Sequence, residues 1–87
     1  MDVSVGDIAY SIAGRDKDSY FVVMAVEGNY AYISNGTSRK SDRPKKKKLK
    51  HLRFEYGNSE HISGKIAKGD KVTNTELRRE LQEYNRQ

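Results

Sequence analysis

The sequence contains no cysteine and only one proline among its 87 residues. The absence of cysteine excludes a disulfide framework and every thiolate metal site, and it suits a reducing compartment. The longest apolar run has seven residues, far short of the ~20 that a membrane span needs. The first residues lack the apolar stretch of a signal peptide. We therefore expect a soluble, cytoplasmic protein that does not use a membrane as its partner.

Hydrophobic residues are also scarce, at 34% of the chain against 33% for charged residues. The apolar residues are grouped rather than scattered, which favours a folded chain over a disordered one. A chain of this length has room for one domain, whose single core is only just sufficient.

Motifs that carry catalytic chemistry are missing as well. The chain has no glycine-rich phosphate loop, no His-x-x-x-His pair and no carboxylate couple in an apolar context. Asp16 and Asp18 have the spacing of a two-carboxylate metal pair, but no third ligand can be placed, so a solvated loop is favoured. We predict a protein that is not an enzyme and that holds no cofactor or metal.

Positive charge is concentrated in one segment. Residues 37–53 contain nine lysines or arginines and one acid, a local charge of +8, whereas the whole chain carries +5 and the rest therefore −3. Cations gathered in one place indicate a polyanionic partner, because each neutralised phosphate releases condensed counterions. The alternative is a solvated loop that only aids solubility, although solubility does not require clustering.

The N-terminal part of the chain has the pattern of short strands joined by tight turns. Apolar and polar residues alternate over residues 3–12, and the apolar run at 20–26 is typical of a central strand. Glycine-containing turns predict hairpins into two further strands, at 30–34 and 37–40. We expect this meander to close on itself as a small barrel, since its open edges must be covered.

The basic segment is predicted to complete the barrel. Pro44 disfavours helix before it, so the lysines begin in an extended or turning backbone. One 3₁₀ turn from Leu49 to Leu52 would direct both leucines inward, and the alternation over residues 52–56 predicts a closing strand. In this interpretation the lysines all face water.

Residues 57–72 are predicted to form a loop that packs on the barrel of residues 1–56. Their composition favours a loop, and their apolar residues are too few for a second core.

A short helix is predicted for residues 73–87. Thr73 and Glu76 match a capping box, and apolar residues recur at helical spacing from 77 to 84. Because so short a helix is marginal alone, we expect it to dock on the barrel. The alternative is a helix presented to a partner protein.

Two segments resemble a known family. Val5-Gly-Asp-Ile-Ala-Tyr-Ser-Ile-Ala-Gly-Arg-Asp-Lys-Asp18, with the apolar strand and tyrosine hairpin after it, resembles a KOW motif. Joined to Arg43-Pro-Lys-Lys-Lys-Lys-Leu-Lys-His-Leu52, it resembles small bacterial KOW-domain RNA-binding proteins, which are similar to KOW-containing large-subunit ribosomal proteins of archaea and eukaryotes. The resemblance covers residues 3–56. It implies an SH3-like β-barrel that binds RNA, commonly ribosomal RNA.

On the same resemblance, Gly14 takes the place of the family's defining glycine, in a loop that often meets RNA. Asp18 stands where these proteins often have glycine, and Asn35 stands where an acid is usual. Both residues are compatible with turns, so these departures affect contact details more than the fold.

The predicted function is therefore non-catalytic binding of structured RNA, in or near the ribosome. Lysine is a point charge that positions a partner without reading bases, which favours recognition of shape and backbone. Arg15 and Lys17 extend the patch if the first loop lies beside it. The candidate RNA contacts are Arg15, Lys17, Arg39, Lys40, Arg43, Lys45, Lys46, Lys47, Lys48, Lys50 and His51.

Two other partners are compatible with the same charge pattern. An SH3-like adaptor would hold an acidic protein by its barrel edge or its C-terminal helix. Attachment to anionic lipid is disfavoured, because no amphipathic apolar face or lipidation signal adjoins the lysines. The six tyrosines could stack on unpaired bases, but packing in the core or on a sheet face is favoured.

Overall fold

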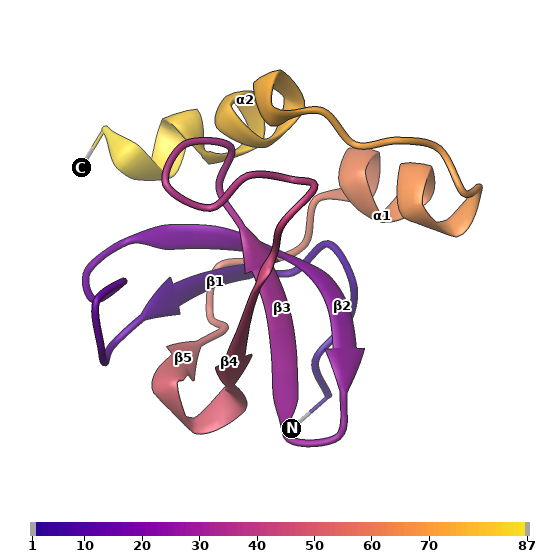
Figure 1. Ribbon diagram of the computed structural model, residues 1–87. Coiled ribbons are helices and arrows are strands. Elements are labelled where there is room, and N and C mark those ends of the chain that lie inside the picture. The colour runs from indigo at the N-terminus through magenta and orange to yellow at the C-terminus, as the bar shows by residue number, and fades with distance from the viewer. Residues whose placement is uncertain (1, 87) are drawn as a thin grey trace.

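A curved antiparallel sheet with two helices over one of its faces makes up residues 2–86, the part of the chain that the computed structural model describes (Figure 1). The strands lie in the order β4-β3-β2-β1-β5. The prediction of a mainly β fold with a C-terminal helix is confirmed. The elements in chain order are β1 (Ile8–Ser11), β2 (Tyr20–Glu27), β3 (Tyr30–Ser34), β4 (Lys45–Lys48), the 3₁₀ turn η1 (Leu49–His51), β5 (Leu52–Arg53), α1 (Glu60–Ala67) and α2 (Asn74–Asn85).

Strand β2 is central, and over residues 21–23 it is buried on both faces. Phe21 and Val23 belong to one hydrophobic cluster, whereas Val22 belongs to the other. Because successive side chains of a strand point to opposite faces, an unbroken apolar run suits a strand covered on both sides. The predicted central strand and the hairpin from β2 to β3 are confirmed.

The first cluster lies inside the curve of the sheet. Leu52 of β5 packs with Ile33 of β3, although two strands separate these elements in the sheet order. The sheet must therefore curl, and the predicted 3₁₀ turn at η1 carries the chain from β4 to β5. Among residues 2–86 the edge strands β4 and β5 share no ladder, so the sheet is curved but open, and the expected closure of the strands into a barrel is not observed. The cluster consists of Ala9, Phe21, Val23, Ala31, Ile33 and Leu52.

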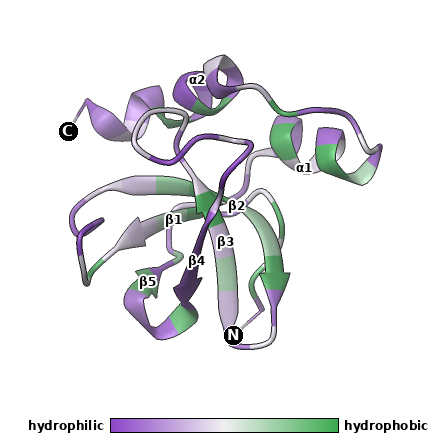
Figure 2. Cartoon of the chain, in the orientation of Figure 1, coloured by the Kyte–Doolittle hydropathy of each residue, from purple (hydrophilic) through white to green (hydrophobic). Residues whose placement is uncertain are grey.

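The second cluster lies between the sheet and the helices. Residues 57–72 have too few apolar residues to make a core alone, as expected, but Ile62 and Val72 share this cluster with apolar residues of β1, β2 and α2. Each fully buried side chain of this size contributes about 1.5–3 kcal/mol. In Figure 2 most of α2 has the colour of hydrophilic residues, whereas α1 includes several hydrophobic positions. The cluster consists of Ile8, Val22, Ile62, Val72, Leu77 and Leu81.

Helix α1 replaces the predicted loop at residues 57–64. Ser59 caps this helix, since its hydroxyl accepts a hydrogen bond from the Ile62 amide at 3.1 Å. Ile62 is fully buried. The local sequence, with Gly64 inside the helix, is a poor helix former, so the prediction failed where tertiary packing overrides propensity.

Helix α2 begins as predicted. Thr73 is the N-cap, and its side chain and that of Glu76 form the reciprocal capping box. Leu77 and Leu81 are fully buried in the second cluster, so the helix docks on the sheet. The predicted range also included Gln87, which lies outside the described residues. Within residues 2–86 no helix is both long and apolar enough to cross a membrane.

The predicted strand at 37–40 is wrong. The Asn35 side chain accepts hydrogen bonds from the amides of Thr37 and Arg39, so the chain turns into a loop instead of a second hairpin. The partner of β3 is β4, which begins after Pro44. The first and last predicted strands, at 3–12 and 52–56, exist but are shorter, as β1 and β5.

Candidate nucleic-acid interface

The loop between β3 and β4, residues 35–44, carries much of the basic segment and is fixed against α2 (Figure 1). Arg78 Nη1 donates to the Gly36 carbonyl oxygen at 2.8 Å, and the Ser41 amide donates to Asn74 Oδ1 at 2.7 Å. Gly36 has φ +80°, and a Cβ at this position would collide with the Asn74 carbonyl oxygen. The start of α2 therefore sets where this loop presents its cations.

A buried carboxylate joins the same loop to residues 13–18, the first loop. Asp16 accepts two parallel hydrogen bonds from Arg39, from Nε and Nη2, each at 3.0 Å. Lys47 Nζ lies 3.7 Å from the same carboxylate and donates to the Ala13 carbonyl oxygen at 2.7 Å. We call Asp16, Arg39 and Lys47 the Asp16 cluster.

Two predictions fail at the Asp16 cluster. Asp16 was expected to be solvated and Lys47 to face water, yet the side chain of each is only 8% exposed. Lys47 pairs with Ala31, a residue of the first hydrophobic cluster, so strand alternation turns the Lys47 side chain inward. A buried ammonium needs a charged partner and hydrogen bonds, and Asp16 and Ala13 supply them.

The cluster brings the first loop to the basic segment. Gly14, with φ +79°, lies so close that a Cβ there would be 3.1 Å from Lys47 Nζ. Arg15 and Lys17 of this loop are exposed. The first loop therefore lies beside the basic segment, which is the arrangement that the prediction for Arg15 and Lys17 required.

A surface hollow gathers the exposed cations of the 35–44 loop. Lys40, Arg43 and Lys45 are exposed at its wall, and Arg39 is held there by Asp16. Cations on a fixed backbone can contact consecutive phosphates without ordering the loop first. We call this feature the basic hollow; it is lined by Ser38, Arg39, Lys40, Arg43, Pro44 and Lys45.

The remaining lysines lie along the other face of β4 and in η1. Lys46 Nζ is 3.1 Å from Glu27 Oε1, and it lies 4.6 Å from the centroid of the Tyr30 ring. The hydrogen bond from Lys46 lowers the pKa of the Glu27 carboxyl, and the same bond raises the pKa of Lys46. Lys48 and Lys50 are exposed and line a second hollow next to Tyr30.

The eleven predicted contacts therefore separate into groups. Lys47 is buried, and His51 is half-buried in η1, where its carbonyl oxygen accepts from the Ile12 amide at 3.0 Å. Three lysines follow the outer face of β4 and η1: Lys46, Lys48 and Lys50. Six residues belong to the basic hollow or to the first loop beside it: Arg15, Lys17, Arg39, Lys40, Arg43 and Lys45.

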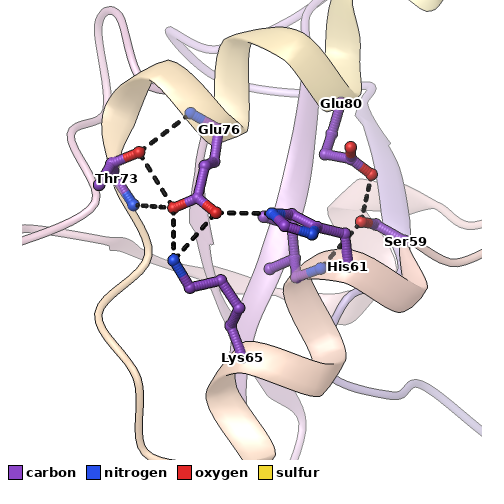
Figure 3. Close-up of polar contacts among 7 residues, drawn as sticks. Ser59, His61, Lys65, Thr73, Glu76 and Glu80 are labelled. Carbon is purple, nitrogen blue, oxygen red and sulfur yellow. Dashed lines mark hydrogen bonds and ion pairs between the residues drawn. The ribbon is translucent and has the colours of Figure 1, made fainter.

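Sequence reasoning missed a second ionic cluster, between the helices (Figure 3). Glu76 Oε2 lies 2.6 Å from His61 Nε2, and Lys65 Nζ donates to both carboxylate oxygens at 2.8 and 2.9 Å. The hydrogen bonds from Lys65, from the Thr73 backbone and from His61 hold the pKa of Glu76 well below its usual range. We call these residues the Glu76 cluster. The i, i+4 spacing of His61 and Lys65 was the available signal, but only for a segment already recognised as helical.

The tyrosines also separate into two groups. The rings of Tyr10, Tyr20, Tyr56 and Tyr84 contact one another, with centroids 4.9–6.3 Å apart, so the packing role is confirmed for these four. Tyr30 and Tyr32 instead lie half-buried on the outer face of β3, beside Lys46.

The described residues contain no group of three or more histidine, aspartate or glutamate side chains that could hold a metal ion. No known family model matches this chain, and no curated protein matches it at a significant level. The KOW resemblance therefore rests on the sequence motifs of this chain alone.

Proposed function

We propose that this protein is a non-catalytic RNA-binding protein of the KOW type, with an SH3-like fold. It contacts the phosphate backbone of structured RNA in the cytoplasm, and ribosomal RNA or another ribosome-associated RNA is its target. The observation that carries the proposal is the basic hollow with the first loop beside it: two cationic segments, distant in sequence, are held together by the buried Asp16.

The charge distribution supports a polyanion over a small anionic ligand. Lys40, Arg43 and Lys45 at the hollow and Arg15 and Lys17 on the first loop are all exposed. The basic segment of residues 37–53 carries +8, whereas the rest of the chain carries −3. A polynucleotide can meet many of these cations at once, and each contact adds counterion release.

Structured RNA is favoured over single-base recognition at the hollow because lysines and arginines line it and no aromatic side chain in its lining could stack on a base. Paired RNA has a deep major groove that side chains cannot read, so proteins recognise it by shape and backbone. Arg39 is fixed by Asp16 in one orientation, as backbone positioning requires.

The test is the salt dependence of binding to a ribosomal RNA fragment with duplex regions. If about six phosphates are contacted, log K should fall with log salt with a slope of about −4 to −5. The variant Arg43→Ala/Lys45→Ala should weaken binding by about 10-fold or more and reduce the slope by about 2. Lys47 is left unchanged, because removing this buried side chain would perturb the fold.

A matched control removes two positive charges elsewhere. Lys68 and Arg79 are exposed in the helical layer, so Lys68→Ala/Arg79→Ala changes the net charge equally. This control should keep the affinity and the slope of the unaltered protein. A slope near zero, or equal losses in both double variants, would show that the hollow does not bind phosphates.

The adaptor alternative makes a different prediction in the same experiment. The apolar stripe of α2, Leu77 and Leu81, is buried against the sheet, which leaves an edge of the sheet as the surface for an acidic protein. If the Arg43/Lys45 variant kept RNA binding and lost a protein partner, the adaptor would replace the proposal.

A further inference from the structure

The outer face of β3 and β4 combines aromatic rings with lysines. Tyr30 and Tyr32 are two residues apart on β3, so their side chains share this face. Tyr30 is paired with Lys48 and Tyr32 with Lys46 on the neighbouring strand, which places two ammonium groups on the same face. We call these four residues the tyrosine-lysine face.

The two tyrosines have no role in the core. The other four tyrosines pack ring against ring, whereas Tyr30 and Tyr32 belong to neither hydrophobic cluster of the described residues. Both are half-buried, and Lys46 beside them has a side chain that is 47% exposed. The rings are therefore reachable from solvent while their positions are set by a strand.

Glu27 contacts one tyrosine and one lysine of this face. The Tyr32 hydroxyl donates to Glu27 Oε1 at 3.3 Å, and Lys46 Nζ lies 3.1 Å from the same oxygen. Lys46 Nζ also lies 4.6 and 5.9 Å from the centroids of the Tyr30 and Tyr32 rings. A cation–π contact at an exposed site is weaker than the stack of a base on an aromatic ring, so a base can displace the ammonium.

From this geometry we infer that the tyrosine-lysine face binds unpaired nucleotides of RNA, with bases stacked on Tyr30 and Tyr32 and phosphates on Lys46 and Lys48. The inference rests on the proposed function, because it adds a single-stranded segment to an RNA whose duplex lies at the basic hollow. Lys48 and Lys50 line a hollow beside Tyr30, which provides a cationic path for the backbone next to the ring. Rings with adjacent cations are the arrangement by which sheets bind single strands with little sequence preference.

The experiment compares three RNAs that share one hairpin. The first is blunt, the second carries a single-stranded extension of about five uridines, and the third carries the same number of abasic nucleotides. The uridine and abasic extensions have equal charge, so a difference between them measures base stacking alone. We expect the unaltered protein to bind the uridine form about 5- to 100-fold more tightly than the abasic form.

Variants assign that difference to the rings. Tyr30→Ala/Tyr32→Ala should abolish the preference for uridine and leave binding of the blunt hairpin unchanged. Tyr30→Phe/Tyr32→Phe keeps both rings and should keep the preference. If the alanine variant unfolds, the comparison of uridine with abasic RNA on the unaltered protein still decides the question.

The variant Glu27→Gln should change the affinity in the opposite direction to the alanine variant. It releases Lys46 from the ion pair and removes a negative charge near the phosphates, so we expect binding of the uridine form to strengthen by about 2- to 5-fold.

The outcomes separate the two proposals. Equal affinity for uridine and abasic extensions, or equal losses in the phenylalanine and alanine variants, would overturn stacking while hairpin binding stands. Failure of all three RNAs to bind would overturn the proposed function itself.

Discussion

Two carboxylates, Asp16 in the first loop and Glu76 in α2, each gather two basic side chains, but their surroundings differ. Asp16 and Lys47 have side chains only 8% exposed, whereas the values in the Glu76 cluster are 16% for Glu76, 27% for Lys65 and 55% for His61. Water can replace lost partners in the second cluster and not in the first. Loss of an ionic partner should therefore destabilise the fold more in the Asp16 cluster than in the Glu76 cluster.

The two clusters also differ in their relation to the candidate nucleic-acid interface. In the Asp16 cluster Lys47 is buried and cannot meet a ligand, but the cluster holds two cationic loops side by side. The Glu76 cluster contains no residue of the basic segment and joins α1 to α2. Not every cation of a basic segment is therefore available to a ligand, because some of them build the surface that presents the others.

The largest expected effect is at Asp16. Asp16→Asn leaves the buried Lys47 ammonium without its counter-charge and weakens both bonds from Arg39, so we expect a loss of about 3 kcal/mol in the free energy of unfolding. Urea unfolding followed by far-UV circular dichroism measures it. Lys47→Met is the matched control, since Asp16 keeps Arg39 and the methionine fills the same space, and its loss should be smaller. Equal stability of Asp16→Asn and the unaltered protein would mean that the cluster does not hold the loops.

An intermediate effect is expected at Glu76. Glu76→Gln weakens the bonds from Lys65 and His61 and one half of the capping box, so the midpoint of thermal unfolding should fall, though less than for Asp16→Asn. Thr73→Ala, which removes only the cap, should cost about 1 kcal/mol. A larger loss at Glu76 than at Asp16 would show that the Glu76 cluster, not the Asp16 cluster, is the one that the fold requires.

The pH dependence of the Glu76 contribution follows from its pKa. The folded-state pKa is lowered from an ordinary value of 4.5, so the folded protein holds the ionised carboxylate more firmly than the unfolded chain does. The resulting stability is present above about pH 4.5 and is lost as the pH falls below it. Urea unfolding at several pH values should therefore show the difference between the unaltered protein and Glu76→Gln shrinking below that pH. A constant difference down to pH 3 would contradict this assignment.

The smallest expected effect is at Asp18, which tests the first loop while leaving the Asp16 cluster unchanged. Asp18 has φ +68°, a left-handed conformation that is strained for a residue with a side chain. Asp18→Gly relieves this strain and loses the hydrogen bond from the Tyr10 hydroxyl, at 2.9 Å. We expect a net gain of about 0.5 kcal/mol in urea unfolding. Tyr10→Phe removes the hydrogen bond alone, and a loss in Asp18→Gly as large as in this control would show that strain is unimportant.

Local patterns were sufficient for much of the fold. The apolar run of β2, the tyrosine hairpin, the 3₁₀ turn at η1 and the capping box of α2 all lie where the sequence predicts them. Each depends on residues within a few positions of one another. The concentration of charge in residues 37–53 is likewise visible in the sequence, because it needs no knowledge of the fold.

Tertiary structure decided what the local patterns left open. Asp16 meets Arg39 23 positions away, and Lys47 meets Ala13 34 positions away, so neither contact leaves a trace in local spacing. Helix α1 forms because Ile62 can be buried under α2, not because its residues favour helix. Four lysines in a row look alike in sequence, but strand alternation sends Lys46 to the tyrosines and Lys47 into the protein. A cation of the basic segment stays exposed or supports the fold according to its contacts with residues that only folding brings near it.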